Sequence, residues 1–184
     1  MKPIPTTYKG YRFRSRLEAT WAAMFDLLAW PWLYEPIDLA GYIPDFILNF
    51  PPAPLLVEVK PAFAFNDLPQ YGAKIAASGW DKDYLIVGAG PLEPDGLYNV
   101  LGLITEQYYP DEHSNVMRWW QSEAILFKCL ECKQYSVLHN DGYWVCRRCG
   151  GYGGKHHIEW IGAEAVKALW GQAHAQTQHQ WRGQ

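Results

Sequence analysis

Three residues in the first third of the chain have the types and spacing of a metal-binding site: Asp45, Glu58 and Lys60. They lie in two runs with the composition of β-strands, and prolines between the runs force a turn. If the strands pair around a four-residue connection at 50–53, Asp45 lies directly opposite Glu58, with Cβ atoms about 5 Å apart. Side chains alternate along a strand, so Lys60 shares the face of Glu58.

Two carboxylates that converge in a partly buried place need a proton or a cation to balance their charge. Their oxygens suit Mg²⁺ or Mn²⁺, and such an ion could polarise a phosphodiester and lower the pKa of a bound water. Lys60 could then orient that water or stabilise charge on the phosphate. On these residues alone, a salt-bridged Asp-Glu-Lys set at a sheet edge is the alternative.

All four cysteines of the chain form two Cys-x-x-Cys pairs, Cys129 with Cys132 and Cys146 with Cys149, separated by thirteen residues. Four thiolates at this spacing predict one tetrahedral structural zinc site. Asn-Asp-Gly at 140–142 predicts a hairpin turn between the pairs. With little apolar core of its own, the resulting zinc ribbon would depend on the metal to fold. Disulfides are the competing interpretation.

Basic residues gather near the start of the chain, between aromatic residues, and again around the second cysteine pair. This pattern predicts contacts with nucleic-acid phosphates and rings for base stacking. A solvated edge before a helix is the alternative for the first group, and a purely structural or protein-docking ribbon for the second. A net charge of -3 argues mildly against coating nucleic acid by charge alone. The predicted contact residues are Lys9, Arg12, Arg14, Arg16, Arg147 and Arg148.

Helices and strands alternate along the chain. Ser15 and Glu18 form a capping box that predicts the start of a helix, and Pro31 predicts its end near Ala29 or Trp30. This order of elements predicts an α/β or α+β fold with a mixed sheet. No element is predicted for 106–121. The other predicted elements are strands at 32–35, 43–50, 55–60, 84–88 and 100–105 and helices at 66–79 and 163–175.

With 184 residues, the chain can hold one ordinary domain and one small module. We expect a nuclease-like domain at 1–118, the zinc ribbon at 119–160, and a C-terminal helix with a flexible tail at 161–184. No apolar stretch approaches the roughly 20 residues of a membrane span. The start lacks the apolar segment of a signal peptide, so a cytoplasmic protein with no membrane partner is expected.

Four short motifs occur in order along the chain. Pro44-Asp45 followed by Glu58-Val59-Lys60 resembles the signature of the PD-(D/E)XK, or restriction-endonuclease-like, nuclease superfamily. With Ser15-x-x-Glu18 and Tyr34-Glu35-Pro36 upstream, the series looks most like the nuclease subunits of cut-and-paste transposons and small phage-encoded nucleases. The resemblance covers about residues 8–90.

This resemblance implies a restriction-endonuclease-like mixed sheet flanked by helices. It also implies that Asp45, Glu58 and the Val59 carbonyl bind Mg²⁺ or Mn²⁺, and that Lys60 assists the attacking water. Glu18 would add a further acidic residue, with helix capping as its alternative role. Gln70 is loosely similar in position to a glutamine of related exonucleases, and we expect it to be structural or merely exposed.

The function expected from these features is Mg²⁺- or Mn²⁺-dependent hydrolysis of DNA by an endonuclease, with the zinc ribbon aiding nucleic-acid or partner binding. One alternative is a non-catalytic nucleic-acid-binding or assembly module that keeps a nuclease fold. Another is a resolvase of branched DNA such as Holliday junctions, which usually acts as a dimer. We therefore expect that the protein could form a homodimer or bind a partner protein.

Overall fold

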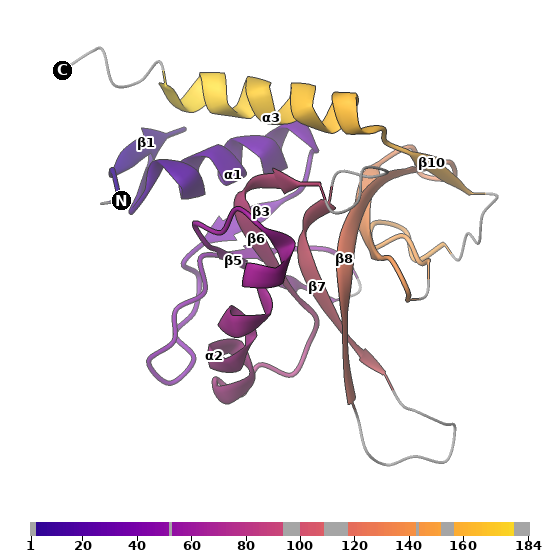
Figure 1. The fold of residues 1–184 in the computed structure, drawn as a ribbon, viewed down its shortest axis with the longest axis horizontal. Coiled ribbons are helices and arrows are strands. Elements are labelled where there is room, and N and C mark those ends of the chain that lie inside the picture. The colour runs from indigo at the N-terminus through magenta and orange to yellow at the C-terminus, as the bar shows by residue number, and fades with distance from the viewer. Residues whose placement is uncertain are drawn as a thin grey trace.

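The computed structural model describes residues 3–51, 53–93, 100–108, 118–142, 144–151 and 157–178. Within these ranges the chain forms a mixed α+β fold (Figure 1). Its strands are β1 Thr6–Tyr8, β2 Tyr11–Phe13, β3 Trp32–Tyr34, β4 Phe46–Leu48, β5 Leu55–Val59, β6 Tyr84–Leu92, β7 Val100–Tyr108, β8 Arg118–Cys129, β9 Tyr135–His139 and β10 Ile158–Trp160. Its helices are α1 Arg16–Leu27, the 3₁₀ turns η1 Phe65–Asp67 and η2 Pro69–Tyr71, α2 Gly72–Ala77, and α3 Ala163–Gln178.

Eight of the described strands form one curled, mixed sheet. Its order is β10-β8-β7-β6-β5-β4-β3, and β9 also pairs with β8. β5 and β6 run parallel, whereas the other pairings described are antiparallel. β1 and β2 form a separate hairpin beside α1. The long β8 ends at Cys129, so the first zinc-ribbon cysteine belongs to the same sheet that contains β4 and β5.

α1 begins where the capping box predicts. Ser15 is the N-cap, and its side chain accepts a hydrogen bond from the backbone N–H of Glu18 at 3.2 Å. The helix ends at Leu27, and Ala29 then adopts a left-handed conformation with φ of 53°. Both predicted ends are therefore confirmed within the fraying expected of helix termini.

Helices cover both faces of the sheet (Figure 1). α1 and α3 lie side by side on one face, where the ring centroids of Trp21 and Trp170 are 4.8 Å apart. Val57 of β5 is buried in that core, whereas Leu56 belongs to a second core with Ile75 of α2 on the opposite face. The alternation along β5 therefore places Glu58 on the face of α2, and the prediction of a sheet covered on both sides is confirmed.

The segment 66–79 is less helical than predicted. It contains η1, η2 and only six residues of α-helix, and Pro69 at the start of η2 has no N–H to continue a helix. β7 extends to Tyr108 and β8 begins at Arg118, so part of the unassigned 106–121 is strand. α3 continues to Gln178, and the rest of the predicted flexible tail, 179–184, lies outside the described residues.

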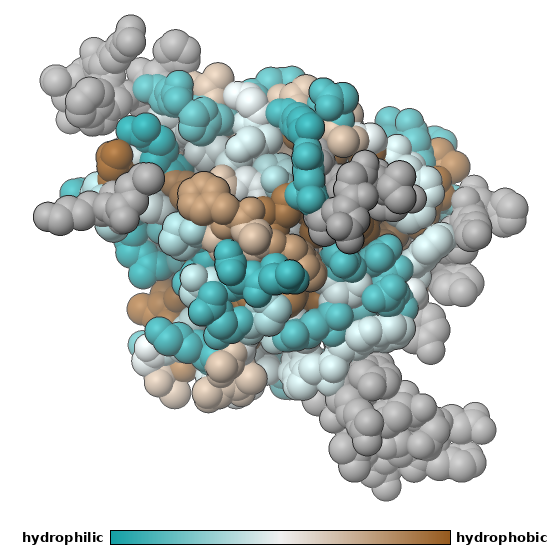
Figure 2. All heavy atoms as spheres, viewed as in Figure 1, coloured by the Kyte–Doolittle hydropathy of each residue, from teal (hydrophilic) through white to brown (hydrophobic). Residues whose placement is uncertain are grey.

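The face drawn in Figure 2 is largely hydrophilic, with apolar side chains exposed in a small central area. Phe63, in the segment after β5, is the most exposed large apolar residue described, at 79%. None of the helices in the described part of the chain has the length and apolar character that a membrane crossing requires.

Candidate active site and zinc site

The pairing of β4 with β5 brings Asp45 and Glu58 together. Phe46 pairs with Val57, which is the predicted register, so the next position along each strand places Asp45 opposite Glu58. The Asp45 side chain also contacts the residue after Glu58, because its Oδ2 accepts a hydrogen bond from the backbone N–H of Val59 at 2.7 Å. Both acidic side chains are buried.

Each of these carboxylates has a cationic partner. Arg14 Nη2 lies 2.6 Å from Asp45 Oδ1, and Lys60 Nζ pairs with Glu58 Oε1. The Tyr42 hydroxyl donates to Glu58 Oε2 at 2.7 Å. The two acids are therefore held in position by four donors from three segments of the chain, around residues 14, 42 and 59–60.

Burial and the neighbouring charge of Glu58 raise the pKa of Asp45 to about 7. The Val59 N–H and the charge of Lys60 act in the opposite direction, and the charge of Glu18 adds to the rise. A carboxyl group with this pKa changes its charge near neutral pH, as expected for an acid that awaits a cation.

Glu18 caps α1 and also lines the site. Its Oε1 accepts from the Ser15 hydroxyl at 2.7 Å. Its Oε2 accepts from the Tyr34 hydroxyl at 2.7 Å and from the backbone N–H of Arg14 at 3.2 Å. The two roles anticipated for Glu18 are therefore geometrically compatible.

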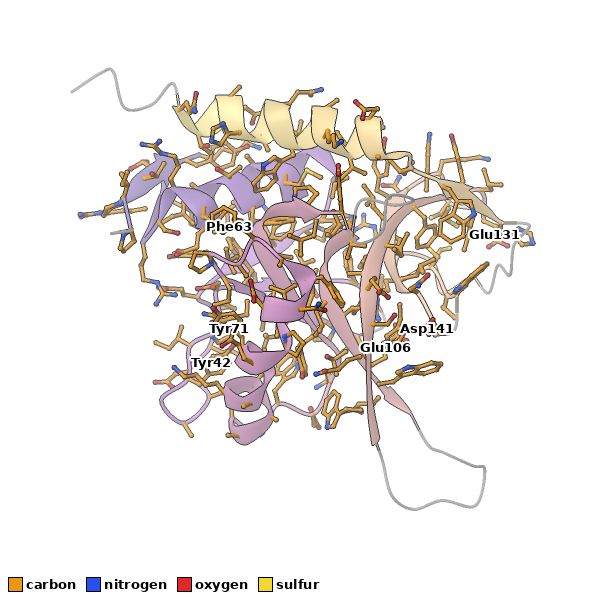
Figure 3. All side chains as sticks on the ribbon, viewed as in Figure 1. Tyr42, Phe63, Tyr71, Glu106, Glu131 and Asp141 are labelled. Atoms are coloured by element: carbon orange, nitrogen blue, oxygen red, sulfur yellow. The ribbon has the colours of Figure 1, made fainter. Side chains whose placement is uncertain are left out.

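These residues surround one open cavity of about 580 Å³. Gln70 and Lys74, from η2 and α2, also line it. Gln70 is exposed, as predicted. Figure 3 shows Tyr42 and Tyr71 in the same region, and the Tyr71 ring centroid lies 5.6 Å from Lys60 Nζ. The residues that line the cavity include Arg14, Glu18, Tyr42, Asp45, Glu58, Val59, Lys60, Gln70, Tyr71 and Lys74.

The donor atoms of the site suit a divalent cation. Four carboxylates, Glu18, Glu35, Asp45 and Glu58, contact or approach the cations Arg14 and Lys60, and Lys74 lines the same cavity, which leaves a formal charge of one negative. The donors are hard oxygens, which suit Mg²⁺ or Mn²⁺. Among the described residues, however, no three of these acids bring their oxygens within 4.8 Å of one another, so side chains must move for several acids to share one ion.

Tyr42 is a site residue that the sequence reasoning missed. It follows a tight turn in which Asp38 accepts a hydrogen bond from the Gly41 N–H at 2.7 Å and Gly41 has φ of 93°. The Leu39–Tyr42 bridge then directs the chain back toward β5. The Gly41 turn was visible in the sequence, but its direction relative to Glu58 depends on tertiary structure.

The predicted phosphate contacts near the start of the chain lie in different surroundings. Arg14 belongs to the acidic cluster, and Lys9 pairs with Asp26 at 2.9 Å. Arg12 is exposed on β2, and Arg16 is the first residue of α1. Phosphate binding by these residues stays a prediction.

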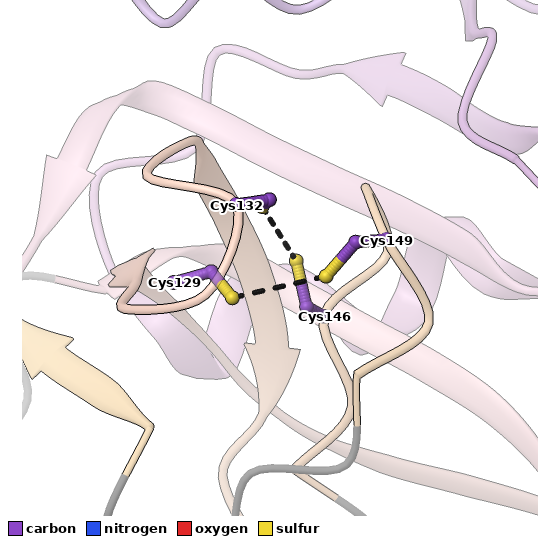
Figure 4. Close-up of side chains that lie close together, drawn as sticks. All are labelled: Cys129, Cys132, Cys146 and Cys149. Carbon is purple, nitrogen blue, oxygen red and sulfur yellow. Dashed lines mark hydrogen bonds between the residues drawn. The ribbon is translucent and has the colours of Figure 1, made fainter.

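Four cysteines meet at the end of β8 (Figure 4). Their sulfur atoms all lie within 4.8 Å of one another. The Cys129–Cys149 separation is 3.9 Å and the Cys132–Cys146 separation is 3.7 Å. A tetrahedral zinc with Zn–S bonds of about 2.3 Å requires S···S distances of about 3.8 Å. The cysteines are free thiols positioned to bind one metal ion, and the arrangement is compatible with structural zinc.

The two cysteine pairs have the same local geometry. The N–H of Lys133 donates to the Cys129 carbonyl at 2.9 Å, and the N–H of Gly150 donates to the Cys146 carbonyl at 2.8 Å. Lys133 and Gly150 both have positive φ, 60° and 72°. The residue after each pair therefore turns the chain back, which leaves both thiols of the pair on the inside of the turn.

Arg147, between the cysteines of the second pair, connects the zinc site to the sheet. Its guanidinium lies 2.8 Å from Asp83, just before β6, and also pairs with Glu106 on β7. Arg148 instead lies over the Phe50 ring, 5.7 Å from its centroid. Of the two arginines predicted to contact nucleic acid here, Arg147 is thus engaged in internal ion pairs, and phosphate binding by either stays a prediction.

No family model, curated protein or solved structure matches the chain. The indications of function therefore come from the chemistry of the acidic cluster and of the four cysteines.

Proposed function

We propose that the protein is a Mg²⁺- or Mn²⁺-dependent nuclease that hydrolyses DNA phosphodiester bonds, acting as an endonuclease. The observation that carries the proposal is the pairing of two buried carboxylates, Asp45 and Glu58, beside Lys60 in an open cavity of about 580 Å³. Burial of two neighbouring carboxylates raises the free energy of the folded state, and a cavity that gives solvent access to them has no structural role.

The architecture supports placing the chain in the PD-(D/E)XK superfamily. A mixed sheet with helices on both faces is the fold that the sequence resemblance implies. The motif residues Asp45, Glu58 and Lys60 lie together at one end of the β4–β5 hairpin. Glu18 reaches the same cavity from the start of α1.

In the proposed reaction, Asp45, Glu58 and the Val59 carbonyl would hold the divalent cation, which would supply positive charge near the phosphate and lower the pKa of a bound water. Lys60 is placed to orient the attacking water or to stabilise charge on the phosphate. Tyr42 positions Glu58 through its hydroxyl. Lys74, which lines the same cavity, would contact the nucleic-acid backbone.

The zinc ribbon completes the proposal as an aid to DNA or partner binding. Its strands β9 and β10 extend the same sheet that carries the acidic hairpin. Arg148 is the ribbon arginine that has no carboxylate partner among the described residues. A structural or protein-docking ribbon is the alternative.

The experiment is a cleavage assay on a substrate panel. Zinc-loaded protein is incubated with supercoiled plasmid, linear duplex and a four-way junction, with Mg²⁺, with Mn²⁺, or with no added divalent cation. We expect cation-dependent nicking of the plasmid. Tight binding of all three substrates without cleavage would instead favour the non-catalytic module, for which the Arg14–Asp45 ion pair is the supporting observation. Cleavage of the junction alone would favour a resolvase.

A further inference from the structure

Arg14 occupies the place in the acidic cluster that a metal ion would need. Its Nη2 lies 2.6 Å from Asp45 Oδ1, its Nε lies 2.7 Å from Glu35 Oε1, and Nε also approaches Glu18 Oε2 at 3.9 Å. A cation bound to Asp45 Oδ1 at the usual distance of about 2.1 Å would lie against this guanidinium. The guanidinium and the cation would repel each other at that oxygen and compete for its negative charge.

We propose that Arg14 is a displaceable internal cation: it neutralises Asp45 until a divalent ion binds, then remains anchored on Glu35 and offers its free Nη groups to the substrate phosphate. This inference rests on the proposed function and adds a positioning residue to it. Arginine suits such a role because its planar guanidinium can hold one carboxylate and bind a phosphate at the same time.

The two side chains of the Arg14–Asp45 ion pair differ in solvent exposure. The Arg14 side chain is 57% exposed, whereas the Asp45 side chain is 5% exposed. Movement away from Asp45 would therefore take the guanidinium into open cavity or solvent and disturb no packed side chain. Asp45 itself stays fixed, because the Val59 N–H holds its other oxygen.

The Glu35 anchor does not depend on the Asp45 contact. Arg14 meets Glu35 through Nε and Asp45 through Nη2, so one contact can break while the other persists. Glu35 has a left-handed backbone with φ of 45°, which is strained for a residue with a Cβ, and its N–H donates to the Asp45 carbonyl at 3.0 Å. Strain of this kind persists where the surrounding structure fixes it and is common at functional sites. Here it accompanies a Glu35 carboxylate that lies 2.7 Å from Arg14 Nε.

The test compares Mg²⁺ and Mn²⁺ affinity of zinc-loaded wild type, Arg14→Ala and Arg14→Gln by titration calorimetry at pH 8. If Arg14 competes with the ion, both variants bind it more tightly, by about 10-fold or more, since a charged hydrogen bond to Asp45 is no longer broken. Both variants should also cleave DNA more slowly, because the phosphate contact is lost. Lys82→Ala removes one exposed positive charge outside the cavity and should leave the affinity unchanged.

Equal or weaker cation binding in both folded variants would overturn the inference, since Arg14 would then be a structural residue or would support the metal ligands. Arg14→Gln keeps a hydrogen-bonding side chain on Glu35 and serves if Arg14→Ala unfolds. The test separates failure of this inference from failure of the proposed function. If wild type binds no divalent ion besides zinc and cleaves no DNA, the proposed function is wrong. If wild type does both and the variants bind the cation no more tightly, only the role of Arg14 is wrong.

Discussion

Replacing Asp45 by asparagine removes a buried negative charge from the acidic cluster and nearly preserves the shape of the side chain. With no divalent ion at the cluster, we expect the Asp45→Asn variant to be more stable than wild type near and above neutral pH. The reason is that the fold has to keep Asp45 ionised beside Glu58 in a buried place, and that burial and repulsion raise its pKa from 3.8 to about 7.

The size of the effect follows from this pKa change. Each pKa unit corresponds to about 1.4 kcal/mol, so about three units cost the folded wild type up to about 4 kcal/mol once Asp45 is fully ionised. The charged contact with Arg14 is already contained in this pKa, so the further loss in the variant is one of hydrogen-bond quality, about 1 kcal/mol. We therefore expect a net stabilisation of about 3 kcal/mol at pH 8.

The pH dependence has a definite sign. The folded pKa of Asp45 lies above the unfolded one, so between about pH 4 and pH 7 the folded state binds more protons than the unfolded state. The stability of wild type relative to the variant therefore falls as the pH rises through this window and changes little above it. The advantage of Asp45→Asn should grow over the same interval.

The assay is urea unfolding of zinc-loaded protein, free of Mg²⁺ and Mn²⁺, at intervals from pH 4.5 to pH 8. Asp81→Asn is the matched control, because the Asp81 side chain is 76% exposed and its substitution changes the net charge equally. A variant that is less stable than wild type by the same amount at every pH would refute the reasoning. The hydrogen bonds of Asp45 would then outweigh its burial and the repulsion from Glu58.

Three further predictions concern the zinc site, its connection to the sheet and the titration of the acidic cluster. Cys146→Ser, or removal of zinc by a strong chelator, should lower the melting temperature of the whole protein in a single transition, since β8 pairs with β9 and β10 on the ribbon side and with β7 of the remaining sheet; a separate ribbon transition in calorimetry would contradict this. Arg147→Met should destabilise by about 1–3 kcal/mol, because two partly buried acids lose their partner, and Glu106→Gln in the same chain should recover part of the loss; a double variant less stable than Arg147→Met would oppose the ion-pair argument. Mg²⁺ affinity should fall as the pH is lowered below about 7, since protons and the cation compete for Asp45; equal affinity at pH 6 and pH 8 would exclude this competition.

Local signals in the sequence were sufficient for several elements. The capping box located the start of α1, because a cap depends only on residues within one helical turn. The β4–β5 register followed from the short, proline-rich connection and from the alternation of apolar residues. The four cysteines were grouped correctly, because two Cys-x-x-Cys pairs can meet at one metal with little choice of geometry.

Features that depend on distant parts of the chain were not predictable in this way. The pairing of β8 with β10 joins Cys129 to Ile158 across the cysteine-rich segment, and no local pattern encodes it. The position of Arg14 in the acidic cluster is another such feature, because the basic residues around Arg14 in the sequence indicated only a basic surface. Arg147 was misleading for the same reason, because its partners come from β7 and the residue before β6.

The central claim is that Asp45, Glu58 and Lys60 form a cation-dependent nuclease site. It is tested most directly by the rate at which purified, zinc-loaded protein nicks supercoiled plasmid in Mg²⁺, with Glu58→Gln prepared in parallel. The account predicts nicking by wild type that requires the added cation and that falls by about 100-fold or more in the variant. Cleavage at the same rate by both proteins, or no cleavage by wild type in either Mg²⁺ or Mn²⁺, would contradict it.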